Sequence, residues 1–196
     1  MPRVDTEDFY RSALARHGPT ACGVHWNSVH TQRARFGALR RFLPQDLSAL
    51  SIVDAGCGLG DLYRYLVEGG SRPGQYVGID MVEPMVEAAR ARTGCAILRL
   101  DILNDPLPEA DYYLCSGAMN TLTREETQVF IARCFTAARC GLVFNLLHGP
   151  DASQTFNQCL PDDVFAWTIP LDADIEVADD YLSGDFTTAL MHRHSR

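Results

Sequence analysis

Between residues 51 and 147 the chain alternates short apolar runs with longer amphipathic segments, and no other feature constrains the fold as strongly. The apolar runs SIVDAG, QYVGID, CAILRLDI, DYYLCSG and GLVFNLL have the length and composition of buried strands. The segments GDLYRYLVEGG, EPMVEAARAR and REETQVFIARCFTAAR are typical of helices. Strands and helices in this alternation predict parallel βαβ units with right-handed crossovers. We therefore expect an α/β fold with a mostly parallel sheet and helices on both faces.

The last third of the chain breaks this rhythm. LPDDVFAWTI predicts a short helix, and DIEVADDY and DFTTALMHR predict two strands joined by LSGD. Two strands so close in sequence, linked by a Ser-Gly turn, predict an antiparallel hairpin at the edge of the sheet. No shift in composition marks a second domain, so residues 1–196 are interpreted as one domain with its core over residues 46–196.

Residues 1–45 precede this core and are predicted to form an N-terminal helical lid or cap. Helices are expected over residues 5–16, with Thr6 as a candidate N-cap, and over residues 31–43, which end before a proline. Residues 17–30, between them, predict a loop rich in glycine and histidine.

The net charge, the apolar stretches and the cysteines of the chain limit which partners it can bind. The chain has 196 residues and a formal net charge of -8, and an acidic surface repels nucleic acid, so a nucleic-acid partner is not expected. No apolar stretch approaches the roughly 18 residues of a membrane span, and the acidic start does not match a signal peptide. The seven scattered cysteines are typical of reduced thiols rather than of a metal site. We expect a cytoplasmic protein without a metal, and the oligomeric state stays open.

The run DAGCGLGD, residues 54–61, lies where the first predicted strand passes into the first predicted βαβ helix. Ligands of parallel α/β sheets bind at this end of the strands, and alternating glycines allow the backbone to approach them closely. The spacing is GxGxG rather than the GxGxxG of dinucleotide sites, because Asp61 stands where the last glycine would be. An acid at a helix N-terminus also repels a pyrophosphate. We therefore predict a ligand without phosphate, and a cationic one fits.

Four motifs in order resemble those of the class I S-adenosylmethionine (SAM) methyltransferases, namely VDAGCGLG, VGID, LRLDIL and DYYLCSGAMN. The whole chain is similar to small bacterial members of this family with unassigned substrates. The resemblance is clear over residues 51–147, and the C-terminal hairpin fits the sixth and seventh strands of the family fold. It implies a Rossmann-like methyltransferase fold with a seven-stranded sheet, SAM as the cofactor, and SN2 transfer of its methyl group.

The resemblance also implies how the cofactor is held. The glycines would lie against the methionine tail, where a Cβ would collide. Asp80 would accept hydrogen bonds from both ribose hydroxyls, and Asp101 would accept one from the adenine amino group. Asp54, the acid before the glycines, would reach the methionine amino group.

Further contacts complete this predicted site. Met81 and Ile102 would enclose the adenine ring, and Ser116 would lie under the sulfonium. Arg33 or Arg35, on the helix before the first strand, would meet the methionine carboxylate. The predicted cofactor-binding residues are Asp54, Gly56, Gly58, Gly60, Asp80, Met81, Asp101, Ile102, Ser116 and Arg35.

The predicted catalytic residues depend on the acceptor, because a general base is needed only where the acceptor holds its proton. Asn120 follows the fourth predicted strand and His148 ends the fifth, so both lie near the transferred methyl group. His30 is the third candidate, and His25, Tyr10 and Tyr181 are further candidates for a base. Residues 1–30 are expected to cover the site, with Trp26 and His30 facing the substrate.

The predicted function is methyl transfer to a small molecule. The acidic charge and the absence of an extra domain disfavour the alternative of a tRNA or protein acceptor. A SAM-binding module without catalysis is a further alternative. An NAD-dependent oxidoreductase is disfavoured, because an acid follows the GxGxG run.

Overall fold

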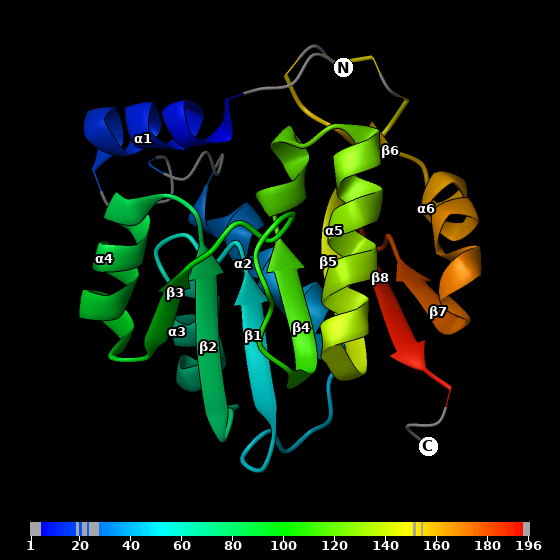
Figure 1. The fold of residues 1–196 in the computed structure, drawn as a ribbon, viewed down its shortest axis with the longest axis horizontal. Helices are drawn as coiled ribbons and strands as arrows, with labels where there is room; N and C mark the ends of the chain where they lie inside the picture. Colours follow the sequence, from blue (N-terminus) through cyan, green and yellow to red (C-terminus); the bar gives the residue numbers. More distant parts are fainter. Residues whose placement is uncertain are drawn as a thin grey trace.

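The computed structural model describes residues 5–18, 20, 23, 28–150, 152–153 and 155–193. An eight-stranded sheet runs through it in the order β3-β2-β1-β4-β5-β8-β7, with β6 paired to β5 (Figure 1). The strands are β1 (Ser51–Ala55), β2 (Gln75–Asp80), β3 (Ala96–Arg99), β4 (Ala110–Ser116), β5 (Ala138–His148), β6 (Gln158–Cys159), β7 (Ala173–Ala178) and β8 (Asp185–His192). The helices are α1 (Thr6–His17), α2 (Val29–Arg41), α3 (Asp61–Glu68), α4 (Glu83–Thr93), α5 (Arg124–Ala137) and α6 (Pro161–Thr168), with short 3-10 turns η2 (Ala118–Thr121) and η3 (Ile169–Leu171).

The predicted α/β fold is confirmed. Strands β1 to β5 pair in parallel, and β8 pairs antiparallel with both β5 and β7. The sheet has one strand more than predicted, because β6 contains two residues and pairs in parallel with the end of β5. A strand of two residues has no periodicity that a sequence pattern can detect.

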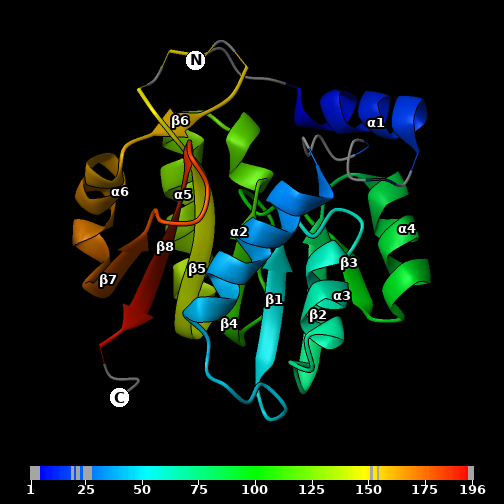
Figure 2. The same ribbon diagram turned by 180° about the vertical axis from the view of Figure 1, so that it is seen from behind.

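Two apolar layers cover the sheet. Side chains of α2, α3 and α4 pack on one face, including Phe36, Leu66 and Val86. Side chains of α5 and α6 pack on the other face, including Phe130 and Val164. Figure 2 shows α2 and α3 crossing the face turned away from the viewer in Figure 1. The burial of both sheet faces explains why the central strands are continuous apolar runs.

The N-terminal helices differ in detail from the prediction. The N-cap of α1 is Asp5 rather than Thr6, since the Asp5 carboxylate accepts from the backbone N–H of Asp8 at 3.0 Å. Helix α2 begins two residues before residue 31, because Ser28 caps it by accepting from the Thr31 N–H at 3.1 Å. A serine or aspartate at this position satisfies a backbone donor that the helix leaves unpaired.

The carboxyl ends of β1, β2 and β4 meet at one edge of the sheet, and α1 lies beyond that edge on the side of β3 and α4 (Figures 1 and 2). Tyr10 and Leu14 of α1 pack against a small apolar cluster formed by Leu59, Val82 and Met85. No helix among the described residues is long and apolar enough to cross a membrane.

Candidate functional site

A cavity of about 500 Å³ opens at this edge of the sheet. Its walls come from α1, α2, the segments that follow β1, β2, β3 and β4, and Phe156. Ten of the predicted site residues line it, namely Arg35, Asp54, Gly56, Gly58, Asp80, Met81, Asp101, Ile102, Ser116 and Asn120. Residues from five separate segments of the sequence therefore gather around one cavity of the size usual for small-molecule sites.

The glycine loop after β1 is folded tightly against the neighbouring strand. The backbone N–H groups of Gly56 and Cys57 both donate to the Ile79 carbonyl, at 2.8 and 2.9 Å. Gly56 has a φ of 79°, and a Cβ on it would lie 2.2 Å from the Ala118 Cβ. A side chain at this position is thus excluded both by backbone conformation and by space.

Gly60 has a different place. It is the N-cap of α3 with a φ of 76°, and a Cβ there would lie 2.5 Å from Thr93 Cγ2 on α4. Gly60 does not line the cavity, so the structure gives it a packing role between α3 and α4. Its contact with a cofactor stays a prediction.

Asp80 ends β2 and joins two loops of the cavity wall. Its carboxylate accepts from the Gly58 N–H and from the Val82 N–H, both at 2.9 Å. Burial raises the pKa of Asp80, and the backbone hydrogen bonds oppose that shift. The Asp80 side chain is therefore part of the loop structure as well as a lining group of the cavity.

Asp54, at the end of β1, is the most deeply buried of the lining carboxylates. Only 2 % of its surface is exposed, and it accepts a hydrogen bond of 2.6 Å from the Tyr76 hydroxyl. Burial raises the pKa of Asp54 to about 7, and the nearby Asp80 carboxylate adds to the shift. The Tyr76 hydrogen bond acts in the opposite direction.

Asp101 follows β3 and is held by its own loop. Its carboxylate accepts from the Leu103 N–H at 2.9 Å and from Asn104 Nδ2 at 2.7 Å. Met81 and Ile102 line the same side of the cavity. The three residues predicted to surround an adenine ring are therefore brought together.

Ser116, at the end of β4, belongs to a chain of polar side chains. Its hydroxyl donates to Asn145 Oδ1 at 2.7 Å, and Asn145 Nδ2 donates to Thr187 Oγ1 at 2.6 Å. The Tyr181 hydroxyl lies 3.0 Å from Thr187 Oγ1. Burial raises the pKa of Tyr181 to about 12, so this candidate base holds its proton at neutral pH.

The two candidate arginines point to different partners. Arg35 lines the cavity and forms an ion pair with Asp185 at the start of β8, and both side chains are at most 10 % exposed. Arg33 instead pairs with Glu68 at 2.9 Å, and both of these side chains are about half exposed. The structure thus places Arg35, rather than Arg33, in the cavity wall.

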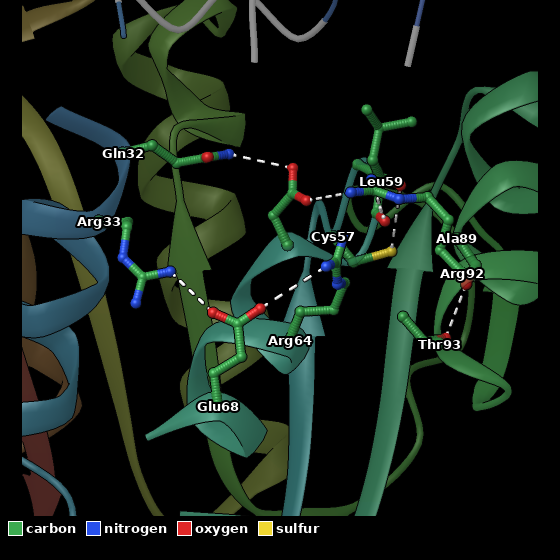
Figure 3. A network of polar contacts seen from close by, with 11 residues as sticks. Gln32, Arg33, Cys57, Leu59, Arg64, Glu68, Ala89, Arg92 and Thr93 are labelled. Carbon is green, nitrogen blue, oxygen red and sulfur yellow. Dashed lines mark hydrogen bonds and ion pairs between the residues drawn. The ribbon is translucent and has the colours of Figure 1, made fainter. Parts of the chain in front are cut away.

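A polar network fixes the start of α3 at the cavity rim. The Asp61 carboxylate accepts from Gln32 of α2 at 3.2 Å and from Arg92 of α4 at 2.6 Å. Figure 3 shows Gln32 and Arg92 approaching from opposite sides, with Arg92 also near Leu59, whose carbonyl it contacts at 2.8 Å. The acid that distinguishes this loop from a dinucleotide site therefore joins three helices.

The candidate catalytic residues separate into two groups. Asn120 lines the cavity, and its Oδ1 is buried without a hydrogen bond within the described part of the chain. His30 is exposed on α2 and His148 is exposed at the end of β5, and neither lines the cavity. His25 and Trp26 lie outside the described residues, and so does their predicted place in a lid.

Several lining residues escaped the sequence prediction. Gln32 and Phe156 are examples, and α1 adds Asp5, Glu7 and Tyr10, the last considered only as a base. They lie in the segments for which the family motifs give no guidance. Among the described residues, no group of three or more His, Cys, Asp or Glu side chains gathers as metal ligands.

The comparisons with known proteins agree with this geometry. The family described as a methyltransferase domain matches residues 52–141, which span β1 to β5 and hold most of the cavity wall. Residues 52–141 therefore form a methyltransferase domain, and the comparisons support a SAM-dependent methyltransferase of class I fold. Magnesium protoporphyrin IX methyltransferase from Synechocystis PCC 6803, solved with bound S-adenosylhomocysteine (SAH), has a TM-score of 0.71 at 14 % identity, over 96 % of this chain and 100 % of that one. A SAM-dependent methyltransferase from Mesorhizobium loti has a TM-score of 0.67 at 20 % identity, over 83 % of this chain and 100 % of that one.

A curated relative of this methyltransferase is the 16S rRNA (guanine(1405)-N(7))-methyltransferase of Proteus mirabilis. The two are 36 % identical over 84 residues, which make up 39 % of this chain and 30 % of that protein. The matched segment is thus under a third of the length of the relative. The solved structures from Synechocystis and Mesorhizobium loti are 14 % and 20 % identical to this chain, so they establish a shared fold only.

Proposed function

We propose that this methyltransferase transfers the methyl group of SAM to a small-molecule acceptor. The observation that carries the proposal is the Asp80 carboxylate, which lies at the tip of β2 beside the glycine loop in the cavity. SAM carries a reactive sulfonium, an ammonium group, two ribose hydroxyls and an adenine amino group. All of these are cationic or donate hydrogen bonds, and the charged side chains of the described cavity wall are mainly carboxylates.

The chain's own residues would bind and orient the two reactants. Asp80 would hold the ribose, Asp101 the adenine amino group, and Asp54 the methionine ammonium group. Ser116 is fixed by Asn145, so the wall beside the reacting centre is rigid. The bound SAM supplies the difficult chemistry in its activated methyl group, so the contribution of the protein is position and the exclusion of water.

The acceptor is proposed to be small because the cavity is acidic and α1 covers part of its opening. Helix α1 lies beyond the sheet edge and contributes Asp5 and Glu7 to the lining. Apart from Arg35, which is paired with Asp185, the described lining holds no lysine, arginine or histidine. Phosphate groups of RNA would meet repulsion at such an opening.

An RNA acceptor is the second candidate, because the Proteus mirabilis relative is named for rRNA methylation. Methyl-labelled SAM separates the two. We expect label to enter the low-molecular-weight fraction of a cell extract and not purified ribosomal subunits. Label in the ribosomal subunits, with none in small molecules, would replace the proposed acceptor by RNA.

Cofactor choice gives a direct test. We expect SAM and SAH to raise the melting temperature, because a ligand at about a hundred times its Kd adds roughly 2.7 kcal/mol to the free energy of unfolding. NADH is the matched control and is expected to give no shift, since the GxGxG loop ends in an acid. A shift with NADH and none with SAM would contradict the proposed function.

A further inference from the structure

Tyr10, on α1, reaches into the cavity from outside the motif-bearing core. Its ring packs against the cluster of Leu59, Val82 and Met85, which follow β1 and β2. Its hydroxyl shares a hydrogen bond with the Thr121 side chain, in η2 after β4. The hydroxyl therefore lies between the ends of the strands that build the proposed cofactor site.

The Tyr10 hydroxyl also feels the charge of Asp80, one of the carboxylates proposed to bind the cofactor. Burial raises the pKa of Tyr10 most strongly, the Asp80 charge raises it further, and Arg35 lowers it. Tyr10 consequently keeps its proton at neutral pH and is a hydrogen-bond donor there, not a base.

A second contact joins α1 to the opposite wall. The Phe9 ring packs edge-on against Phe156, with 6.3 Å between the ring centroids and 79° between the planes. Phe156 itself lines the cavity and follows β5 in the chain. Helix α1 thus spans the opening from the side of β2 to the side of β5.

Of the α1 side chains that the structure describes, Ala13 is buried, and the others are half-buried or exposed. The helix has its own support in the Asp5 cap and in a Glu7–Arg11 ion pair. A segment that carries its own cap and buries little apolar surface can open locally at low cost while it stays helical.

We propose that α1 is a lid over the cofactor cavity, that Tyr10 is its ligand-contacting residue, and that Phe9 and Phe156 form its latch. The proposal rests on the proposed function, because it assigns SAM to the cavity beneath. A closed lid excludes water from the sulfonium and holds the cofactor while the acceptor is oriented. Opening of the latch then sets how fast cofactor and product leave.

The test measures the SAM dissociation rate by stopped flow in the full-length protein. Tyr10→Ala and Phe9→Ala are expected to raise this rate about tenfold each, the value of one lost contact of moderate strength. Tyr10→Phe keeps the ring in the apolar cluster and removes only the hydrogen bond to Thr121, so it should raise the dissociation rate less than Tyr10→Ala does. Tyr65→Phe, on α3 outside the cavity, is the matched control and should match the wild type.

Hydrogen exchange gives a second readout that does not depend on turnover. Bound SAH should slow amide exchange over residues 5–17 in the wild type, and should do so less in Phe9→Ala. Wild-type dissociation rates in both alanine variants, with SAH binding retained, would overturn the lid and leave the proposed function intact. A wild-type protein that binds neither SAM nor SAH would overturn the proposed function, and the lid proposal with it.

Discussion

Asp80→Asn is expected to weaken SAM binding about ten- to a hundredfold, because a charge-assisted hydrogen bond contributes roughly 1.5–3 kcal/mol. The Gly58 and Val82 N–H groups bind different oxygens of Asp80, so asparagine can keep one of these two hydrogen bonds, and the fold should persist with a modest loss of stability. Isothermal titration with SAH measures the affinity, and the melting temperature reports the fold. Asp180→Asn, an exposed carboxylate paired with Arg41 away from the cavity, is the matched control.

The alanine variant should behave differently. Asp80→Ala leaves two backbone donors without the acceptor seen in the structure, and each unsatisfied buried donor costs roughly 1–3 kcal/mol. We therefore expect Asp80→Ala to lower the melting temperature as well as the affinity. Unchanged SAH affinity in Asp80→Asn would show that this carboxylate only holds the two loops together and does not bind the cofactor.

Asp54→Asn is expected to stabilise the protein at pH 8 while it weakens SAM binding. The pKa of Asp54 is about 7 in the folded protein, against an ordinary value of 3.8 for an aspartate. The folded state therefore holds a proton that the unfolded state releases. The stability from this proton is fully present below pH 3.8 and is lost as the pH rises through about 7.

The difference between a pKa of 3.8 and one of about 7 corresponds to roughly 4 kcal/mol in the free energy of unfolding. Asparagine is neutral at every pH and retains an oxygen for the Tyr76 hydroxyl, so it avoids this loss. The measurement is urea unfolding of both proteins from pH 4 to pH 8. The difference between them should grow with pH, and a constant difference would contradict the assignment.

The same group makes cofactor affinity depend on pH. If the ionised carboxylate holds the methionine ammonium group, SAM binding should tighten as the pH rises towards about 7 and then level off. Asp54→Asn should bind weakly and lose this dependence. A wild-type pH profile in the variant would remove Asp54 from the cofactor site.

The glycine loop and the carboxylates at the strand ends could be predicted because short sequence motifs mark them. A glycine run between a strand and a helix fixes the turn, and Asp80 and Asp101 stand at strand ends where a parallel sheet gathers its ligands. The edge hairpin was equally visible, as two strand-like runs joined by a short turn. These features need no knowledge of distant contacts.

The sequence predicted that the N-terminal segment covers the site, but most of the side chains with which it lines the cavity could not be predicted in the same way. Tyr10 and Phe156 face one cavity although 146 positions separate them in the printed sequence, and no periodicity encodes that approach. His30 illustrates the opposite case, because a histidine in a glycine-containing segment suggests an active-site loop, whereas the Ser28 cap places it on an exposed helix face. Long-range packing decides such positions, and local sequence does not record it.

The pairing of Arg35 with Asp185 also has a consequence for the order of synthesis. Arg35 is made early and Asp185 starts β8, yet Asp185 holds Arg35, a residue of the cavity wall, in a buried ion pair. Until β8 leaves the ribosome, Arg35 lacks its ion pair with Asp185, and Asn145 lacks its hydrogen bond to Thr187. We therefore expect nascent chains that stop before β8 to bind no cofactor, so that the enzyme stays inactive until its last strand has been added.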